Sequence, residues 1–305
     1  MEVLPKLLSS VLPLYAFIGV GYAASRWLGL KSKWISWLLL YLLIPVVIFE
    51  HLVKADVTQM VVVAVMVFAL AVLMNVPAWL VRKFWVKDIN KYQLNCSFSY
   101  YNIGWFGIPV VMALFGEEQM PLVMSAYMGN VFYGDTVGYY LVSRSKDLPA
   151  TEAVKNVLKI PAVYASIAAI IANLAGFELP DGIEPVMKGA SWTLSALGMI
   201  MIGIGLSKAN LKQLDYKKYG LIMSSRFVSS IVLMGLLVLA ELALIGQLEG
   251  DEQKLMMLFS IFPIAANLVV FSSFLDTEQE TAALLVASSS IISLVIVPVA
   301  AILLF

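Results

Sequence analysis

The chain has 305 residues, of which 61% are hydrophobic and 13% are charged, and its formal net charge is zero. Soluble domains carry about 25% charged residues, so this composition excludes a soluble protein and indicates an integral membrane protein. A net charge of zero gives no sign of a nucleic-acid partner. The single cysteine, Cys96, excludes an internal disulfide, and no motif calls for a cofactor or a metal.

Ten apolar segments are long enough to cross a bilayer, since a spanning helix needs about 20 mainly apolar residues. We expect these spans at 5–28, 34–53, 58–81, 92–115, 120–143, 159–177, 186–207, 218–246, 253–275 and 280–305. The longest connection between them runs from Arg144 to Leu158. The predicted fold class is therefore all-α, an integral membrane protein of ten transmembrane helices.

Lys and Arg are distributed unequally between the two sides of this topology. The side that precedes the odd-numbered spans holds only Lys6, Lys54, Lys188 and Lys254, and the other side holds all remaining basic residues. The positive-inside rule then places both termini outside the cytoplasm, in a multi-pass protein of the cell (inner) membrane. The charge order around the first span is the reverse of a secretory signal, so we expect an uncleaved span.

Two spans contain residues that are poor material for a continuous helix. These residues are Asn102, Gly104, Gly107 and Pro109 in the fourth span and Pro263 and Asn267 in the ninth. Main-chain groups freed at membrane depth persist only where they are buried in protein or line a cavity. Such interruptions mark the binding sites of transporters, and we predict that these six residues bind a substrate.

The spans divide into two halves of five, residues 1–143 and 159–305, joined by a cytoplasmic linker at 144–158. Because each half has an odd number of spans, the second half enters the membrane inverted relative to the first. The two interruptions therefore approach the membrane centre from opposite sides. The N-terminal ends of their second half-helices carry partial positive charge, which favours a carboxylate without a buried Lys or Arg.

Asp135 and Asn130 are polar residues well inside the fifth span. A charge at the bilayer centre costs about 2.5–3.5 kcal/mol on insertion scales, and such residues often serve ion or proton pathways. Asp135 is therefore a candidate for proton coupling, and a structural partner of a broken helix is the equal alternative. Asn130 is a further candidate for substrate binding.

The remaining polar residues of the spans have simpler interpretations. We expect Arg226, early in the eighth span, to extend to the inner interface. Glu50 and His51 at the end of the second span are expected to be solvated, as is Glu241 in the eighth. The serines at 288–290 and 293 are expected to serve close helix packing.

Four motifs in order along the chain complete the sequence evidence: Leu43-Ile44-Pro45-Val46-Val47-Ile48-Phe49, Asn102-x-x-x-x-Gly107-Ile108-Pro109, Ile202-Gly203-Ile204-Gly205-Leu206 and Pro263-x-Ala265-x-Asn267. With them the chain resembles the auxin efflux carrier family, which includes plant PIN-type auxin exporters and bacterial organic-acid permeases. The resemblance extends from the first span to the last. The chain lacks the long central cytoplasmic loop of the plant members, which favours the bacterial branch.

The resemblance implies two inverted five-helix repeats whose broken helices 4 and 9 cross. It implies a scaffold of spans 1, 2, 6 and 7, through which a homodimer forms, and a transport domain of spans 3–5 and 8–10 that moves as an elevator. The substrates it implies are small organic anions, carboxylates such as malate, malonate or an auxin-like acid. Asn102 matches the asparagine that contacts the carboxylate, and Pro109 and Pro263 match the break prolines. Asn267 matches the bacterial members only.

Other classes of function stay open. A sodium-coupled symporter of the bile-acid-transporter type shares a crossed-helix fold, so the coupling ion is a proton, sodium or neither. A receptor would not need two symmetric interruptions. A hydrolytic enzyme would need a metal cluster or a Ser–His pair, and the chain has one histidine, His51. We therefore expect a carrier and not an enzyme.

Overall fold

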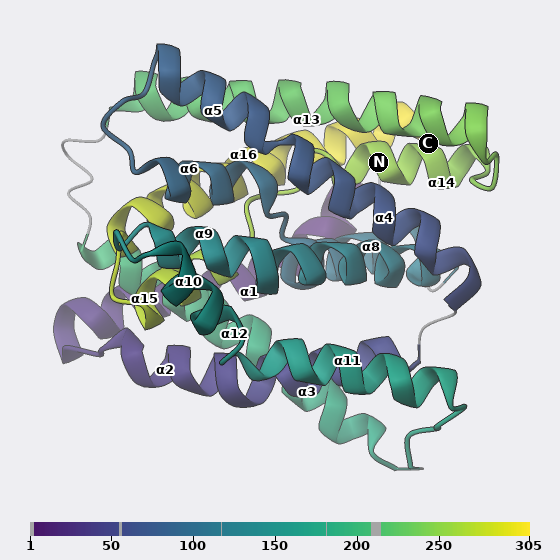
Figure 1. Cartoon of the computed structure of the whole chain (residues 1–305), viewed down its shortest axis with the longest axis horizontal. Coiled ribbons are helices and arrows are strands. Elements are labelled where there is room, and N and C mark those ends of the chain that lie inside the picture. Colours follow the sequence, from purple (N-terminus) through teal and green to yellow (C-terminus); the bar gives the residue numbers. More distant parts are fainter. Residues whose placement is uncertain (1–2, 55–56, 117, 181, 209–214) are drawn as a thin grey trace.

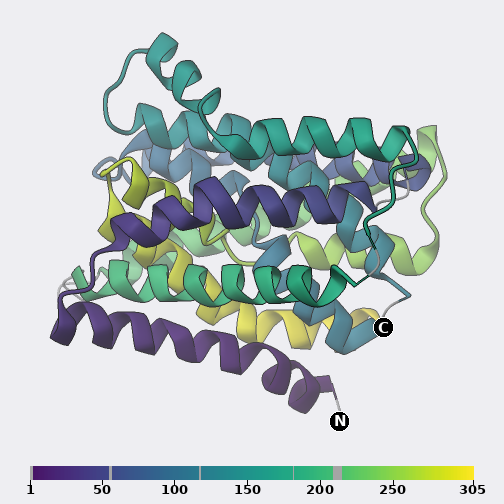
Figure 2. The same ribbon diagram turned by 90° about the horizontal axis from the view of Figure 1, so that it is seen from below.

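The computed structural model describes the chain except for residues 1–2, 55–56, 117, 181 and 209–214. The described residues are helical nearly throughout, and their β-structure is one isolated antiparallel bridge between Tyr101 and Ile264. Most helices run side by side along the long axis of the molecule (Figure 1). The start of α1 and the end of α16 lie at the same end of the helices in Figure 2.

The first half of the chain contains both long helices and interrupted ones. In chain order its elements are α1 (Val3–Leu28), α2 (Ser32–Leu38), η1 (Leu39–Leu43), α3 (Ile44–Val53), α4 (Val57–Leu73), α5 (Asn75–Phe84), α6 (Lys91–Ser99), η2 (Ile103–Gly107), α7 (Ile108–Phe115), α8 (Met120–Tyr133), η3 (Gly134–Gly138) and α9 (Tyr139–Arg144). The elements η1, η2 and η3 are single π-helical turns.

The second half begins after α10 (Ala150–Val157), which lies within the predicted linker. Its helices are α11 (Pro161–Leu174), α12 (Glu184–Lys208), α13 (Tyr216–Leu244), α14 (Gly250–Phe259), α15 (Asn267–Phe274) and α16 (Gln279–Leu304). Prolines stand in the first turns of α3, α7, α8 and α11. In α8 and α11 the missing N–H costs nothing, because that group has no partner within the helix. Helices α3 and α7 instead follow the π-helical turns η1 and η2 directly, so their prolines stand within continuous helical runs.

Five apolar helical runs of the described chain are long enough to cross a membrane by length and composition: 32–53, 61–84, 184–208, 216–244 and 279–304. A sixth is formed if α10 and α11, bent by 51° at their junction, make one span. The chain is therefore an all-helical, multi-pass membrane protein. The expected spans at 92–115 and 253–275 fall on interrupted helices, so the ten-span topology stays a prediction.

The long helices pack in pairs, α1 with α12, α3 with α11, and α4 with α8. Figure 2 shows α1, in purple, alongside α12. This approach depends on Gly21 and Gly203, because a Cβ on either would overlap main-chain atoms of the other helix. Gly129 of α8 is equally close to the Ala64 carbonyl of α4. Small residues permit such backbone contact between membrane helices.

Candidate functional site

In two of the predicted spans, 92–115 and 253–275, the helix stops within the protein and then resumes. The first stops at Ser99 and resumes at Ile103, and the second stops at Phe259 and resumes at Asn267. Both predicted interruptions are confirmed. In the first, the non-helical residues precede the Gly and Pro residues of the motif, which belong to the resumed helix.

The two interruptions are joined by main-chain hydrogen bonds. The N–H of Asn102 donates to the carbonyl of Pro263 at 2.8 Å, and the N–H of Ala265 donates to the carbonyl of Tyr100 at 3.0 Å. Helix ends leave such groups without partners, and in a membrane protein they must be satisfied internally. Each interruption therefore satisfies the other, and we call the pair the crossover.

Side chains from two neighbouring helices complete the crossover. The Asn130 amide of α8 donates to the Tyr101 carbonyl at 2.8 Å, and its Oδ1 accepts from the Tyr101 N–H at 3.1 Å. On the other side Ser289 Oγ of α16 accepts from the Ile264 N–H at 2.9 Å. Asn130 thus binds the main chain with both ends of its amide. Ser289 binds the main chain of the second interruption as Asn130 binds that of the first, a role additional to the packing expected of it.

The side-chain amide of Asn102 has a hydrogen-bond partner at its oxygen and none among the described residues at its nitrogen. Its side chain is 4% exposed and its Oδ1 accepts from the Trp105 N–H at 3.2 Å, so it caps the start of η2. Its Nδ2 has no hydrogen-bond acceptor among the described residues. An unsatisfied buried polar group costs about 1–3 kcal/mol. A carboxylate at the crossover would supply the missing acceptor.

Gly104 and Gly107 allow aromatic rings to pack directly on the resumed helix. A Cβ on Gly104 would lie 2.6 Å from Cε2 of Tyr127, and one on Gly107 would lie 2.5 Å from Cε2 of Phe262. Phe262 belongs to the other interruption, so Gly107 sets how closely the two halves approach. Both glycines shape the crossover, and neither presents a side chain to a ligand.

The three remaining predicted site residues lie at different points of the crossover. Pro263 provides the carbonyl that holds Asn102. Asn267 is the first residue of α15, and its Nδ2 donates to the Tyr100 hydroxyl at 2.8 Å. Pro109 lies in the first turn of α7, and its side chain is outside the described part of the chain.

Arg226 is fully buried at the crossover, so the expectation that it extends to the inner interface is wrong. Its Nε donates to the Ser97 carbonyl and its Nη1 donates to the Phe262 carbonyl, each at 3.0 Å. The guanidinium also lies 4.7 Å from the centre of the Tyr101 ring. Carbonyls at helix C-termini carry partial negative charge. Arg226 therefore joins the ends of the two first half-helices.

Asp135 lies in η3 and is 3% exposed. Neither of its carboxylate oxygens has a hydrogen-bond partner among the described residues. It follows Gly134, against which the Tyr100 ring packs so closely that a Cβ would overlap it. The structural alternative requires a hydrogen bond between Asp135 and a broken helix, and the described residues contain no such bond.

A cavity of about 980 Å³ opens beside the crossover. Its lining includes Gly104 and Trp105 of η2, His51 of α3 and Trp192 of α12. It therefore lies between the helices that resume after the first interruption and the α3 and α12 helices. Of the two lysines in its lining, Lys54 pairs with Glu50 of the same lining and Lys188 pairs with Glu184.

Comparison with known proteins identifies the family of this chain. A family model described as a membrane transport protein matches residues 6–301. The chain belongs to this transporter family, the auxin efflux carrier family. It is also 25% identical over 293 residues to an uncharacterized transporter of Methanocaldococcus jannaschii, across 93% of this chain and 92% of that protein. The resemblance drawn from the sequence motifs is confirmed, and membership agrees with the expectation of a carrier and not an enzyme.

Two acidic residues of this transporter are buried, contrary to expectation. Glu50 is 7% exposed, lines the cavity and pairs with Lys54 at 2.9 Å. Glu241 is 3% exposed, and its Oε1 accepts from the main-chain N–H groups of Gln247 and Leu248 at 2.6 and 3.1 Å. It thereby holds the turn after α13. Sequence position at a span end gave no sign of these partners.

Proposed function

We propose that this transporter is a secondary-active carrier for small organic anions, carboxylates such as malate, malonate or an auxin-like acid, which bind at the crossover. The observation that carries the proposal is the unpartnered Nδ2 of buried Asn102. The Arg226 guanidinium, buried at the crossover, adds positive potential. An anion is therefore the ligand that the local charges favour.

The transporter works, in this proposal, as two inverted repeats at 1–143 and 159–305 joined by the linker at 144–158. Helices α1–α3 with α11 and α12 form the scaffold, and the remaining spans form the transport domain. The symmetric pairing of α1 with α12 and of α3 with α11 supports this division. The cavity between scaffold and crossover supports elevator-type alternating access, and the scaffold is the surface for a homodimer.

Asp135 is the candidate for the coupling proton in this mechanism. A buried carboxylate without partners is costly as an ion, and among the described residues Asp135 has none. The Tyr100 ring packs against Gly134, the residue before Asp135. Its hydroxyl accepts a hydrogen bond from Asn267, and Tyr100 thereby connects the region of the acid to the crossover. Both termini lie outside the cytoplasm in this arrangement. The start of α1 and the end of α16 lie at one end of the helices, which supports an even number of spans.

The test is transport in proteoliposomes of purified protein with radiolabelled malate, malonate and indole-3-acetate. We expect uptake of one carboxylate to respond to a proton gradient in sodium-free buffer. Asn102→Ala removes one charge-assisted hydrogen bond, worth about 1.5–3 kcal/mol, so its affinity should fall roughly ten- to a hundredfold. Asn156→Ala is the control, because Asn156 lies in α10 of the linker and in neither interruption.

Three results would contradict the proposal at different levels. Unchanged affinity in Asn102→Ala would remove this residue from the site. Uptake that requires sodium would replace proton coupling by the sodium-symporter alternative. Failure of every carboxylate to bind or move, with protein that unfolds cooperatively on heating, would exclude an organic-anion carrier.

A further inference from the structure

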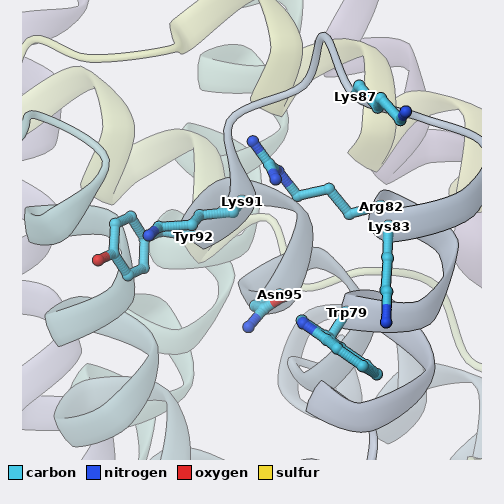
Figure 3. A pocket seen from close by; sticks show the side chains of 7 residues that line it. All are labelled: Trp79, Arg82, Lys83, Lys87, Lys91, Tyr92 and Asn95. Atoms are coloured by element: carbon cyan, nitrogen blue, oxygen red, sulfur yellow. The ribbon is translucent and has the colours of Figure 1, made fainter.

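A second cavity, of about 730 Å³, lies between α5 and the start of α6, away from the crossover. Four of its lining residues are cationic: Arg82, Lys83, Lys87 and Lys91. Trp79, Tyr92 and Asn95 complete the lining. In Figure 3 Arg82 and Asn95 lie between Lys91 with Tyr92 on one side and Lys83 with Trp79 on the other.

The four cations have no carboxylate partner among the described residues. The nearby acid of the same loop, Asp88, pairs instead with Lys218 of α13 at 2.6 Å. This Lys218 hydrogen bond holds the pKa of the Asp88 carboxyl below its usual range. Asp88 is therefore committed to α13, and the positive charge of the cavity is left without a counter-charge in the described chain.

The contacts of these side chains leave their donors available. Lys83 Nζ lies 4.8 Å from the centre of the Trp79 ring, and Lys91 Nζ lies 4.7 Å from that of Tyr92. Such ring contacts place an ammonium without using its N–H groups on an acceptor. Within the described part of the chain Arg82 uses only its Nε, which donates to the Ile89 carbonyl at 3.3 Å. The cavity therefore presents several free donors to an anion.

Exposed aromatic residues show at which depth the cavity lies. Trp79, Phe84 and Trp85 are 53%, 58% and 63% exposed. Tryptophans gather at the level of lipid headgroups, and Trp79 is part of the cavity wall. A ligand here therefore meets both an apolar rim in contact with lipid and a cationic interior.

We propose that this cavity binds the phosphate of an anionic phospholipid headgroup. Basic clusters at membrane helix ends bind anionic headgroups through these charges, and the aromatic rim suits the adjoining glycerol and acyl chains. A free phosphate would use the same cations and would gain nothing from the rim. Because α6 ends at the crossover, the lipid holds the half-helix that leads to the substrate site.

The test is calorimetric titration of the detergent-solubilised protein with short-chain phosphatidylglycerol, short-chain phosphatidylcholine and inorganic phosphate. We expect phosphatidylglycerol to bind and the other two not to bind. Each surface Lys contributes on the order of fivefold to attraction of an anionic lipid. The variant Lys83→Gln/Lys87→Gln/Lys91→Gln should therefore bind on the order of 100-fold more weakly, and Lys87→Gln alone about fivefold.

The matched control removes three lysines that lie outside the cavity, as Lys31→Gln/Lys33→Gln/Lys155→Gln. These side chains are exposed, and we expect wild-type affinity. An equal loss in the control would mean diffuse attraction and overturn the site. Inorganic phosphate that binds as tightly as phosphatidylglycerol would overturn the lipid assignment, and wild-type affinity in the triple cavity variant would overturn both.

Discussion

Replacing Arg226 by lysine tests whether this residue fixes the geometry of the crossover. Lysine keeps the buried charge, so the cost of removing that charge from water is similar in both proteins. It lacks the planar fork with which a guanidinium reaches two acceptors. The 3.0 Å bonds to the carbonyls of Ser97 and Phe262 then cannot both persist. Loss of one charge-assisted hydrogen bond should lower the free energy of unfolding by about 1.5–3 kcal/mol.

The same change should weaken the binding of the transported anion. Phe262 directly precedes Pro263, whose carbonyl holds Asn102, so a loosened carbonyl displaces the amide that faces the ligand. We expect the affinity of Arg226→Lys to fall about tenfold, equivalent to about half the upper figure for one such bond. Arg226→Met removes both bonds and the charge, and relief of desolvation offsets part of its loss of stability.

The measurements are equilibrium unfolding in denaturant and calorimetric binding of the anion that the wild-type protein prefers. Arg26→Lys is the control, because Arg26 is exposed near the end of α1. If Arg226→Lys matches the wild type in both measurements while Arg226→Met loses affinity, then only the charge of Arg226 matters and the geometric reasoning is refuted.

Three further predictions concern other parts of the transporter. Asp135→Asn should abolish uptake driven by a proton gradient and leave exchange between equal pools intact, and wild-type gradient-driven uptake would end the coupling proposal. Gly107→Ala should lower the free energy of unfolding by about 1–3 kcal/mol through overpacking against Phe262; Gly189→Ala, with nothing within 4 Å of the added Cβ, should not. Cysteines added at the two ends in a Cys96→Ser background should react with an impermeant reagent in whole cells, and protection of both would reverse the topology.

The sequence predicted that the two helices break, because Asn, Gly and Pro oppose a helix by local chemistry, but the first break lies before its glycines and proline. It did not predict that Tyr100 and Tyr101 form the non-helical part of the first interruption. Both residues are compatible with a helix, and they are extended because Ala265 and Asn130 offer their main chain hydrogen bonds. Those partners are distant in sequence, so no local pattern contains them.

Arg226 and Glu241 were misjudged for a related reason. A charged residue near the end of an apolar span ordinarily reaches water, and the sequence shows nothing against this. Their actual partners are main-chain carbonyls and N–H groups, which every residue carries and which no residue type reveals. The transport family, in contrast, was predictable because its motifs are side chains at fixed spacings.

The hydrogen bonds of the crossover are mostly formed by main-chain atoms, with the side chains of Asn130, Asn267 and Ser289 added to them. Main-chain bonds persist whichever side chain a position carries, proline excepted as a donor. If the crossover binds the ligand as proposed, substitutions around the ligand can therefore accumulate while the frame that presents it stays intact. Descendants of one ancestral carrier can in this way exchange their cargo by changing few residues, without first solving the folding problem again.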